Sequence, residues 1–202
     1  MTGQLPGRRP GDHDQVPAPE IAVELLDGTQ AARHADDLLA LATEVYADPP
    51  YRQDAQQAAG MASRLRVRCR QPGFALAEAR HGGYLVGYAL GMPLRPSTSW
   101  WQHLTAPLPA ELTTEHPGRT FALAELLVQA AWRRQGIGRD LHDLILAGRA
   151  EERVTATLWP AAAPAQAAFR SWRWRKVARA RDPEPGSPVL DVLIRTLPAG
   201  QG

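Results

Sequence analysis

The spacing of apolar residues divides this chain into short strands and a few longer helices. Runs rich in apolar residues, of the length that strands have in folded domains, cover 21–26, 74–79, 84–91, 121–128, 153–158, 174–179 and 189–194. The run at 121–128 is almost continuous and only Glu125 interrupts it, which is typical of a strand covered on both faces. The pattern therefore predicts a sheet with a strand in its interior.

Helical spacing appears between these runs. The first predicted helix ends at Pro49–Pro50, and its apolar residues share one face: Leu38, Leu41, Ala42 and Val45. A second helix is expected over 54–68 with Met61 and Leu65 inward, and an alanine-rich helix over 161–172. Asp27–Gly28 is typical of a turn, and the glycines at 82 and 83 predict a hairpin between the second and third strands. No period favours a helix or a strand from Pro93 to Pro117.

A strand, a glycine-bearing turn and an amphipathic helix follow one another over 121–146. After the turn, Ile137, Leu141, Leu144 and Ile145 recur at helical spacing. A helix that begins at a Gly-x-Gly turn leaves its first N–H groups without partners, and its dipole adds to their attraction for an anion. Gly136 and Gly138 let a ligand approach the backbone. Together with the arginines at 133, 134 and 139, this pattern predicts a pyrophosphate site.

Two other phosphate motifs do not fit the turn. A P-loop ends in Gly-Lys-Ser/Thr, whereas Gly138 is followed by Arg139. The dinucleotide fingerprint needs a third small residue where this chain has Leu141. The turn Arg133-Arg134-Gln135-Gly136-Ile137-Gly138 instead resembles motif A of the GNAT family of acyl-CoA-dependent N-acetyltransferases. Residues 164–177 resemble the family's motif B, and the order of elements from about 20 to 197 follows its plan.

The resemblance implies a fold and a cofactor. The fold is α/β (α+β), with a central mixed, mostly antiparallel sheet of six to seven strands, about four flanking helices, and a gap where strands four and five splay apart. The co-substrate implied is acetyl-CoA, with no metal. Its site would include the N–H groups of Leu127 and Val128, and the following motif residues: Arg133, Arg134, Gln135, Gly136, Ile137, Gly138, Arg139 and Phe169.

Four positions depart from the family pattern. Ala130 stands where Pro is common, and Arg134 where Gly is common. Phe169 stands where motif B commonly carries a Tyr that protonates the leaving thiolate, and Arg173 takes the place of the Gly that follows. Since phenylalanine has no proton to give, either another group or water protonates the thiolate, or the protein has given up catalysis.

Candidate residues for the acceptor side come from the residues themselves and the family plan. A carboxylate within an apolar strand is costly to bury without a partner or a task, so Glu125 is our candidate general base; the alternative is a structural pair with a nearby arginine. Trp100 and Trp101 are candidates for an aromatic wall that binds the amine, or for a cover over the end of the sheet. His103 and His116 are weaker candidate bases.

Composition limits the remaining choices. A chain of 202 residues forms one domain, here 20–197, with a disordered tail at 1–19 and a flexible end at 198–202. Without an apolar run of about 18 residues we expect no membrane span. The single Cys69 and the polar start indicate the cytoplasm, and a net charge of +2 gives no argument for nucleic acid.

Two functions stay open at this point. The first is transfer of acetyl from acetyl-CoA to a primary amine, expected to be that of a small molecule, with protein amines as other acceptors. The second is a non-catalytic acyl-CoA-binding regulator that has kept the fold. The oligomeric state also stays open, with a homodimer as one option.

Overall fold

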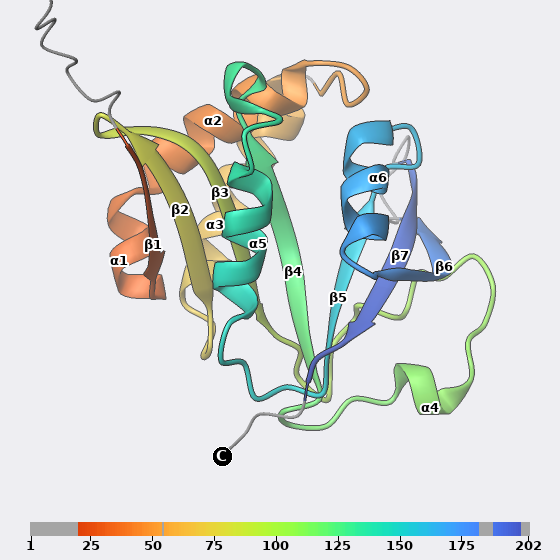
Figure 1. Cartoon of the computed structure of the whole chain (residues 1–202). Helices are drawn as coiled ribbons and strands as arrows, with labels where there is room; N and C mark the ends of the chain where they lie inside the picture. The colour runs from red at the N-terminus through yellow and green to blue at the C-terminus, as the bar shows by residue number, and fades with distance from the viewer. Residues whose placement is uncertain (1–19, 54, 182–187, 199–202) are drawn as a thin grey trace, which may run out of the picture.

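The computed structural model describes residues 20–53, 55–181 and 188–198. The expected tail at 1–19, most of the expected turn at 182–188 and residues 199–202 lie outside this part of the chain. Within it, strands form one mixed sheet in the order β1-β2-β3-β4-β5-β7-β6 (Figure 1). They are β1 (Ile21–Leu26), β2 (Ala75–His81), β3 (Tyr84–Pro93), β4 (Thr120–Val128), β5 (Arg153–Leu158), β6 (Arg175–Arg181) and β7 (Val189–Thr196).

The helices lie on both faces of the sheet. They are α1 (Gly28–Arg33), α2 (Ala35–Ala47), α3 (Ala55–Cys69), α4 (Ala110–Thr113), α5 (Ile137–Leu146) and α6 (Ala163–Ser171), with a 3-10 turn η1 (Ala130–Trp132). Side chains of α1, α2 and α3 pack on one face of the sheet, and those of α5 and α6 pack on the other. The expected elements are confirmed, apart from the short α4 and a division of the first helix into α1 and α2.

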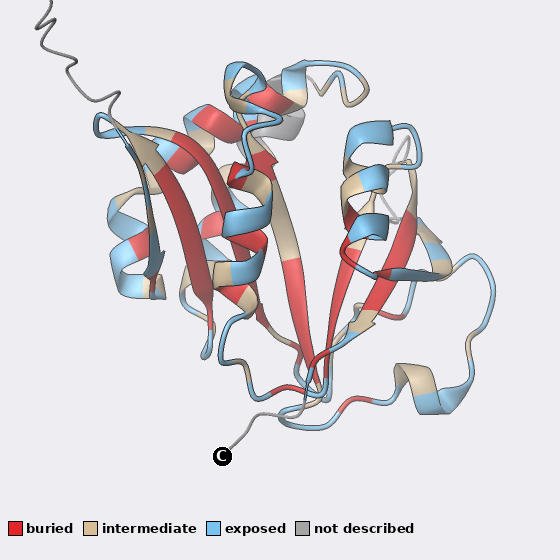
Figure 2. Cartoon of the chain, viewed as in Figure 1, coloured by how far each residue is buried: buried red, intermediate tan, exposed pale blue. Residues whose placement is uncertain are grey.

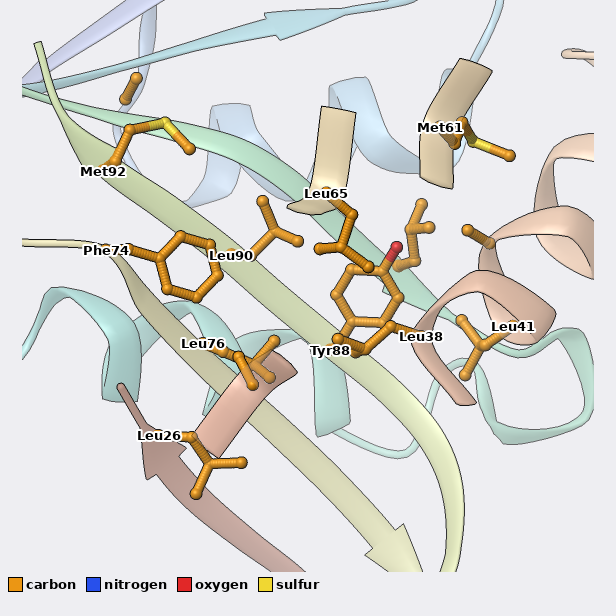
Figure 3. Close-up of a cluster of buried hydrophobic side chains, with 14 of the residues drawn as sticks. Leu26, Leu38, Leu41, Met61, Leu65, Phe74, Leu76, Tyr88, Leu90 and Met92 are labelled. Carbon is orange, nitrogen blue, oxygen red and sulfur yellow. The ribbon is translucent and has the colours of Figure 1, made fainter. Parts of the chain in front are cut away.

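Strand alternation sends neighbouring residues into two separate cores. In β2, Leu76 faces α1–α3, whereas Ala75 and Ala77 face α5. The first core holds large side chains, including Leu38, Leu90 and those labelled beside them in Figure 3. The middle of the sheet is buried from both sides, as Figure 2 shows, which explains the almost continuous apolar run of β4.

The dipeptide Asp27–Gly28 begins a helix and is not a simple turn. The Asp27 side chain accepts hydrogen bonds from the N–H groups of Thr29 and Gln30, and the Gln30 side chain accepts one from the Asp27 N–H. This capping box satisfies N–H groups that the first helical turn leaves free. The Asp at 27 and Gln at 30 were its signal in the sequence.

A parallel pair at the centre of the sheet opens into a gap. β4 and β5 pair only from Thr120–Arg153 to Ala122–Thr155, and every other strand pair in the described residues is antiparallel. Beyond Ala122 the two strands diverge, with α6 beside β5, as Figure 1 shows. The divergence begins at a β-bulge: Leu90 pairs with Glu125 and Gly91 with Leu123, so Ala124 is the extra residue.

Candidate active site

The gap between β4 and β5 contains a small pocket. Its cavity is about 100 Å³. One side of it consists of β4 residues and the other of β5 and α6 residues, with two tyrosines from the α2–α3 region above. The lining residues are Tyr46, Tyr51, Leu123, Ala124, Glu125, Leu126, Leu127, Ala156, Thr157, Leu158, Trp159, Ala165, Ala168, Phe169 and Trp172. The pocket therefore brings together Glu125, Leu127 and Phe169, which the sequence analysis proposed separately.

The hydrogen bonds between β3 and β4 determine which N–H groups of β4 face this gap. The Gln129 N–H donates to the Val86 carbonyl at 2.9 Å, so Gln129 and Val86 form a hydrogen-bonded antiparallel pair. Such pairs alternate along a ladder, which turns the Leu127 N–H toward Tyr88 of β3. The N–H groups of Leu126 and Val128 point the other way, toward β5. The Val128 N–H therefore faces the gap, as a donor there would require, whereas the Leu127 N–H does not and that of Leu126 does.

The predicted phosphate turn forms an open helix start. Gly136 is the N-cap of α5, with φ of 90°, and no side chain caps the helix. A left-handed residue there is the reason for glycine, and the first N–H groups of α5 are left for a ligand. A Cβ added to Gly138 would meet Leu126 and Val128 at 3.8 Å, which is an ordinary contact. The protein therefore does not need glycine at 138 for its own packing. A ligand that approaches the backbone closely would need it.

The basic side chains of the turn have different partners. Arg133 Nε donates to the Val128 carbonyl at 3.0 Å, and Gln135 Nε2 donates to the Ala131 carbonyl at 3.3 Å. Arg139 lies 3.7 Å from Asp143 and 5.6 Å from the Trp172 ring centre. Arg134 has φ of 67°, in the left-handed region. This conformation explains why glycine is common at the position in the family pattern.

Glu125 has two close partners. Its Oε1 lies 2.6 Å from Arg68 Nη1, and its Oε2 accepts a hydrogen bond of 2.6 Å from the Tyr88 hydroxyl. The carboxylate side chain is 16% exposed, so it is accessible from the pocket. Burial and the Glu125 charge raise the pKa of Tyr88 and of Tyr46, so both phenols stay protonated and can donate but not act as bases. The pairing matches the structural alternative for Glu125, and leaves lone pairs for one further contact on each oxygen.

Aromatic rings from three segments cover the side of the pocket nearest α2. The Tyr46 and Tyr51 rings meet edge to face at 5.1 Å, and Tyr51 and Trp159 do so at 5.4 Å. These residues were not among those predicted for the site. Their signal was available, since two tyrosines bracket Pro49–Pro50 between two helices and a tryptophan follows β5. Their convergence, however, depends on the tertiary fold.

Phe169 packs inside the far wall. It is 4% exposed, and its ring centre lies 5.3 Å from Trp172 and 5.0 Å from Trp174. The ring lines the pocket, as the family plan implied for this position. No hydroxyl is present there, so any proton for a leaving group must come from elsewhere. Arg173 has φ of 65°, in the left-handed region, which explains why the family commonly has glycine at this position.

The tryptophan pair lies elsewhere. Trp101 is 8% exposed and its indole N–H donates to the buried Glu115 at 2.9 Å. Glu115 in turn pairs with Arg153 at the closed end of the β4–β5 gap. Trp100 packs against the hydrophobic core on the α1–α3 face of the sheet, which includes Trp101. Neither ring lines the pocket, and this position matches the alternative of a cover over the end of the sheet. His103 is exposed, and His116 lies 3.4 Å from Glu152; neither lines the pocket.

Comparison with known proteins decides the family. The model described as Acetyltransferase (GNAT) family matches residues 34–172, which is more than half of the chain. The chain belongs to the GNAT family. It is therefore an acetyltransferase, and membership implies acetyl-CoA as its acyl donor. No curated protein matches this GNAT protein significantly in sequence.

Solved structures agree with this GNAT fold. The GNAT-family acetyltransferase of Staphylococcus aureus has a TM-score of 0.61 at 12% identity, covering 88% of this chain and 100% of that one. The ribosomal-protein-S18-alanine N-acetyltransferase of Escherichia coli has 0.60 at 14%, covering 90% and 97%. An acetyltransferase of Thermus thermophilus has 0.57 at 17%, covering 89% and 99%. At these identities the likeness establishes the fold.

The residues at the gap fit acetyl-CoA. An uncapped helix start with positive-φ Gly136 suits a pyrophosphate, and the unpaired edge of β4 offers N–H groups along the gap. Within the part of the chain that the structure describes, no helix is long and apolar enough to cross a membrane. The same residues hold no group of three or more His, Cys, Asp or Glu side chains that could bind a metal ion.

Proposed function

We propose that this GNAT protein transfers acetyl directly from acetyl-CoA to a primary amine of a small molecule. The observation that supports this best is the pocket between β4 and β5, where a carboxylate, gap-facing amides and five aromatic rings surround about 100 Å³. A cavity of this size holds a slender group. The rings of Tyr46, Tyr51 and Trp159 suit the apolar body or the cationic resting form of an amine.

Acyl transfer needs a proton acceptor for the amine and donors for the oxyanion. Acetyl-CoA supplies the thioester acetyl group when it is bound. We assign the oxyanion contact to the N–H groups of Leu126 and Val128, which face the gap. Glu125 accepts the amine proton, directly or through a water molecule. Arg68 holds this carboxylate in place at 2.6 Å.

The departing thiolate needs no acid from α6. A thiolate is a good leaving group near neutral pH, and Phe169 has no proton to donate. Tyr46 and Tyr51 line the same pocket with phenols. The cytoplasmic location and the option of a homodimer, both inferred from the sequence, stay predictions.

An acceptor panel tests the proposal. Release of free thiol from acetyl-CoA would be followed with small aliphatic and aromatic primary amines, and with peptides that begin with alanine, because one structural neighbour is a ribosomal-protein-S18-alanine N-acetyltransferase. We expect turnover with the small amines and little with the peptides. Turnover confined to peptides would overturn the small-molecule assignment. Binding of acetyl-CoA without turnover on any amine would favour the acyl-CoA-binding regulator.

A further inference from the structure

His142 is a fully buried histidine at the junction of the two halves of the sheet. It lies on α5, and its side chain is 0% exposed. Nδ1 lies 2.7 Å from Asp143 Oδ1, and Nε2 lies 3.1 Å from the Trp174 indole nitrogen and 3.3 Å from Arg195 Nη1. The imidazole also stacks on Trp172, with ring centres 4.3 Å apart. One side chain thus joins α5 to two segments beyond the gap, the turn between α6 and β6 and the strand β7.

The partners determine where the imidazole proton lies. An indole N–H and a guanidinium can only donate hydrogen bonds. Since Trp174 and Arg195 both face Nε2, that nitrogen must accept and carries no proton. The single proton of the neutral ring is on Nδ1 and donates to the Asp143 carboxylate. A second proton, on Nε2, would point at two donors.

The stack connects this histidine to the cofactor gap. Trp172 lines the pocket between β4 and β5, and the Arg139 guanidinium lies 5.6 Å from the centre of the same ring. Arg139 belongs to the turn that begins α5. His142, Trp172 and Arg139 therefore form a continuous contact from the interior to the predicted pyrophosphate turn.

We propose that His142 is a positioning residue for acetyl-CoA: its neutral imidazole fixes α5 to the turn between α6 and β6 and to β7, and this clamp holds the Trp172 ring in the position that the cofactor needs. This rests on the proposed function in placing acetyl-CoA in the gap. Protonation of His142 removes the acceptor for Trp174 and places a cation 3.3 Å from Arg195. The ring must then move, and Trp172 with it.

The surrounding charges set the direction of the pH effect. Burial lowers the pKa of His142, and the charges of Arg195 and Arg139 lower it further, whereas Asp143 acts in the opposite sense. The clamp is therefore complete at neutral pH. Protonation begins only below the ordinary histidine value of about 6.5. We expect affinity for the cofactor to fall in that acid range, by up to about tenfold per pH unit, because one proton must be released on binding.

The test is calorimetric binding of CoA at pH 8.0 and pH 5.5 by three proteins. They are the parent, His142→Gln, and His103→Gln as a control in the exposed loop. Glutamine can accept from Trp174 and Arg195 but cannot become charged. The phosphates of CoA titrate near pH 6, so the quantity compared is the ratio of dissociation constants between the two pH values. The titration of the CoA phosphates affects all three proteins equally, so it cancels when the three ratios are compared.

We expect the parent and His103→Gln to lose up to about tenfold more affinity at pH 5.5 than His142→Gln does. Equal acid dependence in all three proteins, with binding intact at pH 8.0, would overturn the clamp alone. No binding by the parent at pH 8.0 would overturn the cofactor assignment, and the clamp with it.

A second variant covers the case in which His142→Gln does not fold. Trp174→Phe keeps a ring but removes the donor at Nε2, so protonation of His142 becomes easier. The acid loss of CoA affinity should then begin at a higher pH than in the parent. An unchanged midpoint, or a shift to lower pH, would contradict the proposal. Acetyl transfer measured on the same variants should show the effect in KM for acetyl-CoA more than in kcat, as expected for positioning.

Discussion

Replacing Glu125 with Gln removes the proposed base and keeps its size. The contacts of Glu125 determine how much the substitution changes the free energy of unfolding. Glu125 and Arg68 are 16% and 26% exposed, and the hydrogen bond from Tyr88 adds a second donor. A glutamine oxygen can still accept one of these bonds, but its amide group faces a donor. We expect the free energy of unfolding to fall by about 1–3 kcal/mol, the range for hydrogen bonds to charged groups.

The expected loss of activity follows from the same contacts. General bases contribute about 10²–10⁴-fold. Because Arg68 and Tyr88 already bond the two oxygens of Glu125, less of the carboxylate is open to the amine, and we expect the lower value, about 10²-fold in kcat/KM at pH 7. The variant should recover as pH rises, because a free alkylamine with a pKa near 10 then supplies its own neutral form, about tenfold more per pH unit.

The assay is thiol release between pH 6.5 and 9.5 with the best amine of the panel. Urea unfolding in parallel shows that both proteins are folded at every pH used. Arg68→Met provides the matched control, since it leaves the carboxylate in place and frees it from its partner. Parallel pH–rate profiles for the parent and Glu125→Gln would refute the general-base assignment, and Glu125 would then be a structural partner of Arg68.

Other residues give further predictions. Gly138→Val should abolish most calorimetric binding of acetyl-CoA while the melting temperature stays nearly constant, since a Cβ there meets the protein only at 3.8 Å; parent-like binding would disprove the phosphate turn. Phe169→Tyr places a hydroxyl at the pocket, and turnover should rise by up to about 10²-fold if thiolate departure is limiting; unchanged turnover shows that it is not. Arg173→Gly should raise the free energy of unfolding by about 0.5–1 kcal/mol, because relief of left-handed strain exceeds the entropy cost of glycine, and urea titration would reveal a loss if this is mistaken. Burial raises the pKa of Glu78, but its hydrogen bonds from Arg80 and His34 outweigh this and lower it; stability should therefore be complete above about pH 4.3 and fall as acid lowers the pH through the folded-state value, and Glu78→Gln should flatten that slope in acid unfolding.

Much of the fold could be predicted because local patterns carry it. The apolar runs gave the strands, and the spacing of Leu38, Leu41 and Val45 gave the buried face of α2. Prolines marked the helix end. The two misread segments were those where local rules conflict: Asp27–Gly28 serves turns and helix caps equally well, and α4 is a four-residue helix too short to show a period.

Only part of the candidate site could be predicted from the sequence. Gly136 and Gly138 predicted the cofactor turn, because the left-handed backbone at 136 requires glycine and the missing Cβ at 138 leaves space for a ligand. The direction of the Leu126 N–H, however, follows from the bulge at Ala124 and from the hydrogen-bond pattern between β4 and β3. Neither feature can be predicted from the residue types of the strand. Trp101 was a candidate for an aromatic wall at the amine site or for a cover over the end of the sheet, and its hydrogen bond to Glu115 places it in the core at the sheet end.

By itself the sequence determined the elements and the family and predicted the phosphate turn, since each depends on residues close together along the chain. Tertiary structure decided which side chains meet. Glu125 reaches Arg68 from another helix and Tyr88 from a neighbouring strand, and Tyr51 reaches Trp159 across more than a hundred residues of chain. His142 acquires its tautomer from Trp174 and Arg195 in the same way. The physical reason is that hydrogen bonds and ring contacts act over a few ångströms in space, and only the packing of the two sheet halves fixes that separation.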